Sequence, residues 1–154
     1  MNDHTPFPAL GADLLQTIDA AVPKLRAMSE PQAGRPRTAG KWTPKQIIGH
    51  LIDSASNNHQ RFVRAQEVGE LRFPPYAQEH WVACQHYTDR PWDDLVTLWY
   101  AYNRHLAHVI SHIPEHRRDV ACIIESTSPV TLGHLAFDYG EHLRHHLAQV
   151  GVFP

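Results

Sequence analysis

The chain has 154 residues, of which 42% are hydrophobic and 19% charged, and its formal net charge is -2. This length and composition are typical of one globular domain, covering residues 1–154, that buries a core without disulfides or repeats. No basic run or basic helical stripe points to a nucleic-acid partner. No apolar run reaches the roughly 18–20 residues that cross a bilayer. We therefore expect a single domain that binds neither nucleic acid nor membrane.

The cysteines and the first residues bear on location. Cys84 and Cys122 are too few for a disulfide framework or an all-cysteine metal site. The chain does not begin with the charged and then apolar pattern of a secretory signal. We therefore expect free thiols in a reducing cytoplasm. The unusual number in the composition is 13 histidines, which are dispersed along the chain.

Four amphipathic helical patterns follow one another, and almost nothing alternates like a strand. The first pattern spans about residues 12–28, and Pro23 inside it is expected to kink or break the helix. A polar linker over residues 29–41 leads to the second helix. Four such helices in one small domain predict an all-α four-helix bundle.

The other three helices begin at recognisable signals. Thr43 suits the N-cap of the second helix, Pro44 suits its first turn, and Gln46 completes a capping box. The third helix opens at Pro91, and Thr131 caps the fourth. We therefore expect these three helices to start close to the named residues.

Two connections are less regular than the helices. Residues 68–90 join the second helix to the third, and a connection of this length in a small domain is either functional or crosses the structure. Residues 115–130 are polar apart from the short run 120–124. That run leaves an extended strand and a packed loop both open.

Near the C-terminus, two histidines have a spacing suited to metal binding. His142 and His146 are four residues apart, so they lie on one helix face with their backbones roughly 6 Å apart along the axis. Two imidazoles can bridge that distance to a single ion. The helical phase turns His134 and His145 toward water instead. An H-x-x-x-H pair alone is a weak signal, and two ordinary boundary histidines are the alternative.

A third histidine, His50, lies at the edge of the apolar face of the second helix. It can join His142 and His146 only if the second and fourth helices run antiparallel. A connection over residues 68–90 that crosses the bundle makes the second and third helices parallel and satisfies this condition. The predicted topology is therefore up-down-down-up, with a long crossover between helices two and three.

Several motifs together resemble those of the DinB/YfiT-like family of metal-dependent bundle proteins. The segment from Trp42 to Ser54, which contains His50, is similar to the one that carries that family's first metal histidine. The segment from His142 to Ala148 is similar to its closing motif. Further landmarks are Arg61-Phe62, Pro75-Tyr76 and Trp81. The resemblance implies that His50, His142 and His146 bind one divalent metal ion, zinc or nickel first, with iron, manganese and copper as alternatives.

The resemblance also implies an activity, because family members include hydrolases and transferases or isomerases that use low-molecular-weight thiols. Three neutral imidazoles leave a divalent ion its full charge and open positions, and such an ion lowers the pKa of water or of a thiol. No fourth protein ligand is convincing, because Asp53, His59 and Glu141 point elsewhere. We expect a metal-dependent hydrolase or thiol S-transferase that acts on a small molecule. A non-catalytic, metal-stabilised bundle with a role in binding or stress response is the alternative.

Three polar residues follow His50 along the second helix. Ser54, Asn57 and Arg61 lie on the same strip, so they are candidates for lining a substrate pocket, with a solvated bundle edge as the alternative. The guanidinium of Arg61 suits a carboxylate or a phosphate. No residue is assigned as general acid or base. The resemblance and the aromatic residues of the crossover and third helix also favour a homodimer.

Overall fold

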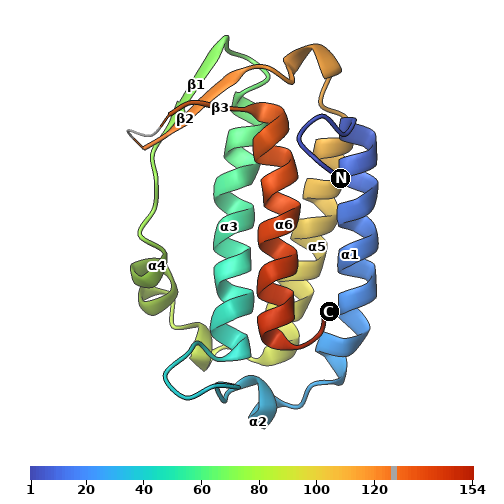
Figure 1. The fold of residues 1–154 in the computed structure, drawn as a ribbon. Coiled ribbons are helices and arrows are strands. Elements are labelled where there is room, and N and C mark those ends of the chain that lie inside the picture. The colour runs from blue at the N-terminus through green and yellow to red at the C-terminus, as the bar shows by residue number, and fades with distance from the viewer. Residues whose placement is uncertain (126–127) are drawn as a thin grey trace.

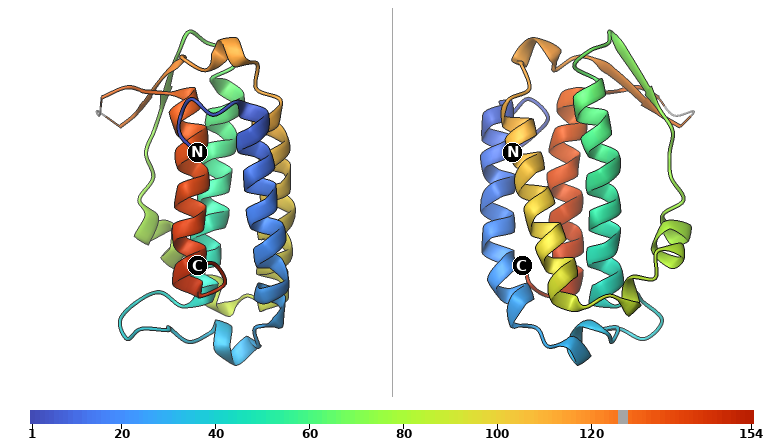
Figure 2. Two further views of the ribbon diagram at one scale, coloured as in Figure 1. Left: turned by 45° about the vertical axis from the view of Figure 1, so that its right-hand side comes forward. Right: turned by 180° about the vertical axis from the view of Figure 1, so that it is seen from behind.

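Four long helices run side by side and dominate the described structure (Figure 1). They are α1 (Phe7–Ala27), α3 (Pro44–Arg64), α5 (Trp92–Ser111) and α6 (Leu132–Val150). The computed structural model describes residues 1–125 and 128–154. In both views of Figure 2, α1 and α3 lie along α5, while α6 packs against α1 and α3. Within the described residues, no helix combines the length and the apolar character that a bilayer span needs.

The directions of the helices decide which residues meet. In Figure 1, α3 and α5 both run from the lower end of the molecule to the upper end, while α1 and α6 run the opposite way. The segment between α3 and α5 returns along the outside of the bundle. As a result, the first turns of α3 and the last turns of α6 lie at the same end.

Short helices occupy the connections. A four-residue helix, α2 (Glu30–Ala33), interrupts the linker after α1, and its N-cap Ser29 forms a capping box with Gln32. The crossover contains α4 (Gln78–Cys84) and the 3₁₀ turn η1 (Tyr87–Asp89). A second 3₁₀ turn, η2 (Glu115–Arg117), follows α5. These elements are too short to show a periodic pattern, so they were not predicted.

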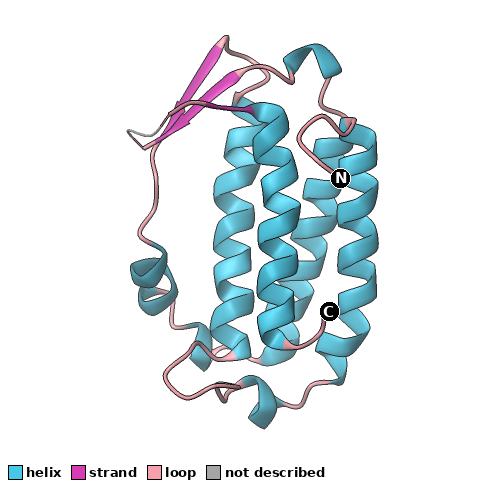
Figure 3. Ribbon diagram, viewed as in Figure 1, coloured by secondary structure: helices cyan, strands magenta, loops and turns pink. Residues whose placement is uncertain are grey.

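A small sheet corrects the prediction that the fold is all-α (Figure 3). Strand β1 (Glu70–Phe73) pairs in parallel with β2 (Ala121–Ile124), and β2 pairs antiparallel with β3 (Val130–Thr131). The run over residues 120–124 is therefore mostly extended. Strands of two to four residues are too short to reveal an alternating pattern. They pair because the crossover leaves α3 beside the segment that enters α6.

The predicted helix starts are confirmed for α3 and α6. Thr43 accepts a hydrogen bond from the backbone N–H of Gln46, and the reciprocal half of the capping box is also present. Thr131 accepts a hydrogen bond from the N–H of His134. The first helix instead starts at Phe7, five residues before the predicted start, and continues through Pro23 to Ala27. Pro23 lies on the exposed side of α1, where water can satisfy the carbonyl that loses its partner.

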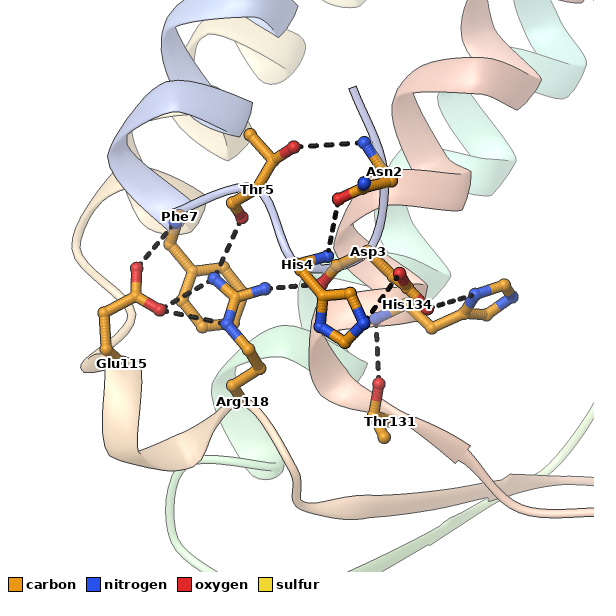
Figure 4. Close-up of polar contacts among 9 residues, drawn as sticks. All are labelled: Asn2, Asp3, His4, Thr5, Phe7, Glu115, Arg118, Thr131 and His134. Carbon is orange, nitrogen blue, oxygen red and sulfur yellow. Dashed lines mark hydrogen bonds and ion pairs between the residues drawn. The ribbon is translucent and has the colours of Figure 1, made fainter.

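The N-terminal segment is held against the η2 turn and the start of α6 (Figure 4). The guanidinium of Arg118 donates to the carbonyl oxygens of Asp3 and Thr5 at 2.6 and 2.9 Å and pairs with Glu115 at 2.7 Å. Glu115 in turn accepts from the N–H of Phe7 at 2.8 Å. The Arg118 guanidinium also lies 4.4 Å from the centroid of the Phe7 ring. These contacts explain why α1 begins five residues earlier than its apolar pattern suggested.

The crossover is fastened to the first turns of α3, which carry the first candidate ligand. Lys45 is buried, pairs with Glu30 and donates to the carbonyl oxygens of Thr88 and Arg90 at 3.3 and 2.7 Å. The ring of Tyr87 lies directly over Gly49. Glycine is required there because a Cβ at position 49 would come within 2.2 Å of that ring. The η1 turn therefore packs on α3 one residue away from His50.

This close approach predicts that Gly49→Ala destabilises the protein. Alanine should favour the helix by roughly 1 kcal/mol. Overpacking against the Tyr87 ring costs about 1–3 kcal/mol and should outweigh that gain. Urea unfolding should show a lower midpoint for the variant. Gly69→Ala is the matched control, because no atom lies within 4 Å of a Cβ at that position. A destabilisation of Gly69→Ala equal to that of Gly49→Ala would contradict the packing argument.

Candidate metal centre

Three histidines from two distant parts of the sequence converge at the lower end of the bundle. One ring nitrogen from each of His50, His142 and His146 lies within 4.8 Å of the other two. The Nε2 atoms of His50 and His142 are 3.2 Å apart. The ring centroid of His146 lies 4.6 Å from that of His50 and 4.5 Å from that of His142. The triangle is closed because α3 and α6 pack antiparallel.

Burial keeps these imidazoles neutral. Desolvation is the main cause that lowers the pKa of His50 to about 4 and that of His142 to about 3, and it also lowers the pKa of His146. Repulsion from His146 also lowers the pKa of His50 and of His142. For His146, the hydrogen bond to Gln149 partly opposes the lowering, and repulsion from His145 adds to it. Neutral imidazoles with free lone pairs are the form that binds a metal ion. The donor set therefore fits a divalent transition metal held by three nitrogens.

A glutamine on the next turn orients His146. The side-chain oxygen of Gln149 lies 2.8 Å from His146 Nδ1, so Nδ1 carries the proton and Nε2 keeps its lone pair. The same amide donates to Nε2 of the exposed His145 at 3.0 Å. On the other side of the cluster, the Trp42 ring lies 5.2 Å from the ring of His50. Hydrogen bonds such as the one from His146 to Gln149 fix the tautomer of metal-ligating histidines.

None of the residues considered as a fourth ligand belongs to the cluster in the described part of the chain. His59 contacts the Tyr102 hydroxyl at 3.1 Å, and Glu141 pairs with Arg144. The helical phase suggested that Asp53 points away from the protein, but it does not. It is 2% exposed and accepts hydrogen bonds from Tyr87 and Gln85 at 2.6 and 2.7 Å. The crossover, whose course was not predictable in detail, covers it.

Two pockets flank the histidine cluster. The smaller has a volume of about 270 Å³ and contains His142 in its wall, and the larger has a volume of about 630 Å³ and contains His146. Gln78 of the crossover lines both. The smaller pocket runs between α3, α6 and the crossover and is lined further by Ser54, Asn58, Arg61, Tyr76, Asp138 and Tyr139. The larger is lined further by Arg37, Lys41, Trp42 and Gln149.

The three residues expected beside the metal differ in where they point. Ser54 and Arg61 line the smaller pocket, whereas Asn57 does not and its neighbour Asn58 does. The side chain of Asn57 turns back and donates to the carbonyl oxygen of Asp53 at 2.9 Å. An asparagine inside a helix has this local alternative, which the helical phase alone does not reveal.

Several pocket residues were not predicted as site residues. Tyr76 and Gln78 come from the crossover, and Gln149 from the last turn of α6. Tyr76, whose ring lies 5.1 Å from the Trp81 ring, was noted only as a motif landmark. Its position in the long connection was the available signal. Gln149 could have been found from its spacing of three residues after His146.

Known proteins share this fold and part of this sequence. Residues 13–150 match the model of the DinB superfamily. A protein of Oceanobacillus iheyensis, named "Putative metal-dependent hydrolase OB0413", is 20% identical over 128 residues, which are 83% of this chain and 73% of that protein. A Bacillus mycoides protein with the same kind of name is 30% identical over 57 residues, which are 37% of this chain and 33% of the relative.

Two solved structures resemble the computed one. YfiT from Bacillus subtilis, described as a probable metal-dependent hydrolase with an unusual four-helix bundle topology, has a TM-score of 0.79 at 20% identity and covers 92% of this chain and 83% of its own. The mycothiol-dependent maleylpyruvate isomerase has a TM-score of 0.78 at 15% identity, and the match covers 98% of this chain but 63% of the isomerase. At these identities the two structures show a shared fold. Because the family model spans nearly the whole sequence, the chain belongs to the DinB superfamily.

Proposed function

We propose that this protein is a metal-dependent enzyme that transfers a low-molecular-weight thiol to or from a small molecule. The observation that carries this proposal is the pair of pockets that flank the histidine cluster, one lined by His142 and one by His146. A transferase needs separate sites for two reactants next to its reactive centre, and holding them in place supplies much of the rate. The name of the mycothiol-dependent isomerase, which shares the fold, also supports a thiol substrate.

His50, His142 and His146 would hold the ion, which we take to be zinc or nickel, with iron, manganese and copper as alternatives. When bound, a divalent ion supplies a positive charge that lowers the pKa of a thiol or a water molecule in contact with it. The other contributions come from side chains of the protein. Gln149 keeps Nε2 of His146 available. Arg37 and Lys41 outweigh the single acid Glu79 in the lining of the larger pocket, which favours an anionic thiol.

Hydrolysis is the second candidate, and it is favoured by the names of the sequence relatives. It needs water and one substrate, so it would use only one of the two pockets. A non-catalytic bundle stabilised by metal is the remaining alternative. The three roles differ in what they consume, which makes them separable by experiment.

The ligand assignment predicts that His50→Ala, His142→Ala and His146→Ala each lose bound metal. Removing one of three nitrogens should weaken metal binding at least about tenfold, as even loss of an outer-shell partner does. His145→Ala is the matched control, because this neighbour is exposed and lies outside the cluster. Metal content should be measured by mass spectrometry on protein purified without a nickel column. An equal loss of metal from His145→Ala would overturn the assignment.

The proposed reaction predicts loss of free thiol in the presence of an electrophilic acceptor, only with metal-loaded protein. A panel of low-molecular-weight thiols should be screened with an epoxide and a chloroaromatic acceptor, and the free thiol titrated over time. Chelation or His50→Ala should abolish the activity. Thiol-independent hydrolysis of an ester substrate would favour the hydrolase instead. Metal that raises the melting temperature while neither activity appears would favour the non-catalytic role.

The lowered histidine pKa values predict that the metal-free protein loses stability as the pH falls from 7.5 to 5. In the unfolded chain these histidines bind protons below about pH 6.5, while in the folded protein the pKa of His50 is about 4 and that of His142 about 3. Unfolding therefore takes up protons in this range, which destabilises the native state by about 2 kcal/mol per histidine at pH 5. Urea unfolding at both pH values measures this loss. His142→Gln should reduce it and the exposed His145→Gln should not, so equal effects would contradict the prediction.

The assembly and the location remain proposals. We expect a homodimer on the strength of the family resemblance, and Leu98 on α5 and Val63 on α3 are large apolar side chains that are 50% and 42% exposed. Sedimentation at micromolar concentration tests this, and a monomer of 17.5 kDa would disprove it. A cytoplasmic location rests on the two cysteines, Cys84 and Cys122, both of which are free thiols.

A further inference from the structure

A buried cation that forms no ion pair with the described residues lies in the pocket beside the histidine cluster. Arg61 is 9% exposed, and it lines the smaller pocket together with His142. Within the described residues, its guanidinium donates a long hydrogen bond from Nη1 to the side-chain oxygen of Asn58 at 3.4 Å, and its Nε atom is buried without a partner. The Phe73 ring, 5.5 Å away, offers only a cation–π contact.

Other arginines of this protein show what a partly buried guanidinium normally receives. Arg144 pairs with Asp13 at 2.5 Å and with Glu141, and Arg118 pairs with Glu115 at 2.7 Å. Both are only half-buried, whereas Arg61 is buried. Arginine keeps its charge at neutral pH. A buried, charged guanidinium that forms no ion pair with the described residues therefore has room for an anion from outside.

We propose that Arg61 binds the carboxylate of the substrate whose reactive end lies at the histidine cluster. This inference rests on the proposed function and names the substrate class for its smaller pocket. A planar guanidinium with its Nε free can hold a carboxylate through two parallel hydrogen bonds. Asp138 and Glu125 are exposed and also line this pocket, so the single charge of a carboxylate suits it better than the two charges of a phosphate.

The helix geometry limits the length of that substrate. The side chain of Arg61 leans back toward Asn58, as their hydrogen bond shows, and Asn58 lies eight residues after His50. That separation is a rise of roughly 12 Å along α3. About 5 Å of it is taken up by contact distances at the two ends, namely a metal–sulfur bond and a hydrogen bond. The remaining length of roughly 7 Å fits an extended chain of about five atoms between the reactive group and the carboxylate.

The test uses 6-mercaptohexanoate, whose thiol stands in for the reactive group of the substrate and which has this length, and 6-mercaptohexanamide, which has the same shape without the charge. Their dissociation constants should be measured by calorimetry on zinc-loaded and on metal-free protein. Wild-type protein should bind the acid about tenfold more tightly than the amide in both states, because a hydrogen-bonded ion pair is lost with the amide. The Arg61 Nε–H resonance, identified by its absence in Arg61→Met, should shift with the acid and not with the amide.

The variants separate a specific clamp from general attraction. Arg61→Met should remove the preference for the acid and leave binding of the amide unchanged, while Arg61→Lys should keep only part of it because an ammonium lacks the fork. Arg64→Met is the matched control, since Arg64 lies three residues further on α3, is exposed and bonds to Gln60 at 2.9 Å. It should behave as wild type.

The outcomes for Arg61 and for the proposed function are distinct. Equal affinity of wild-type protein for the acid and the amide would overturn the role of Arg61, whether or not the variants fold. An equal loss in Arg64→Met and Arg61→Met would overturn it too. If the protein prefers the acid but zinc strengthens the binding of neither probe, Arg61 keeps its role and the thiol chemistry fails. If zinc strengthens the binding of both probes equally and neither probe is preferred, the thiol chemistry stands and the role of Arg61 fails.

Discussion

The antiparallel packing of α3 against α6 is the constraint on which the candidate site depends. It brings His50 to 3.2 Å from His142 although 92 residues separate them in the sequence. Consecutive helices joined by short loops alternate in direction, and in such a bundle α3 and α6 would be parallel. The segment from β1 to η1 prevents this by returning along the outside of the bundle. Its contacts with Lys45, Gly49 and Asp53 then hold it against the turn of α3 that carries His50.

The same burial that builds the core also prepares the histidines. Desolvation opposes the charged imidazolium more strongly than the neutral ring, so folding itself removes the protons that would compete with a metal ion. Burial is therefore the common cause of the stable core and of the neutral imidazoles that can bind a metal ion. His145, the residue directly before His146, is exposed and lies outside the cluster.

The features that were predictable from the sequence are those set by local chemistry. The capping box at Thr43, the cap at Thr131 and the facing pair of His142 and His146 follow from spacings of three and four residues. The three-stranded sheet and the burial of Asp53 depend on contacts between distant segments, which spacing does not encode. Asn57 shows a third kind of limit: the helical phase placed its Cα correctly, but a hydrogen bond to its own helix turned the amide away.

The buried polar atoms that lack a partner are unevenly distributed over the described residues. His50 Nδ1, Asp53 Oδ2 and Arg61 Nε all belong to α3, and the others are Trp99 Nε1 and Arg117 Nε. Leaving such an atom unpaired in a protein interior costs about 1–3 kcal/mol. A helix whose capping box is complete and whose apolar face is buried could have carried apolar residues at these positions with greater stability. Unsatisfied groups that cluster on one helix face are what a site for polar ligands requires, because partners already present would compete with those ligands.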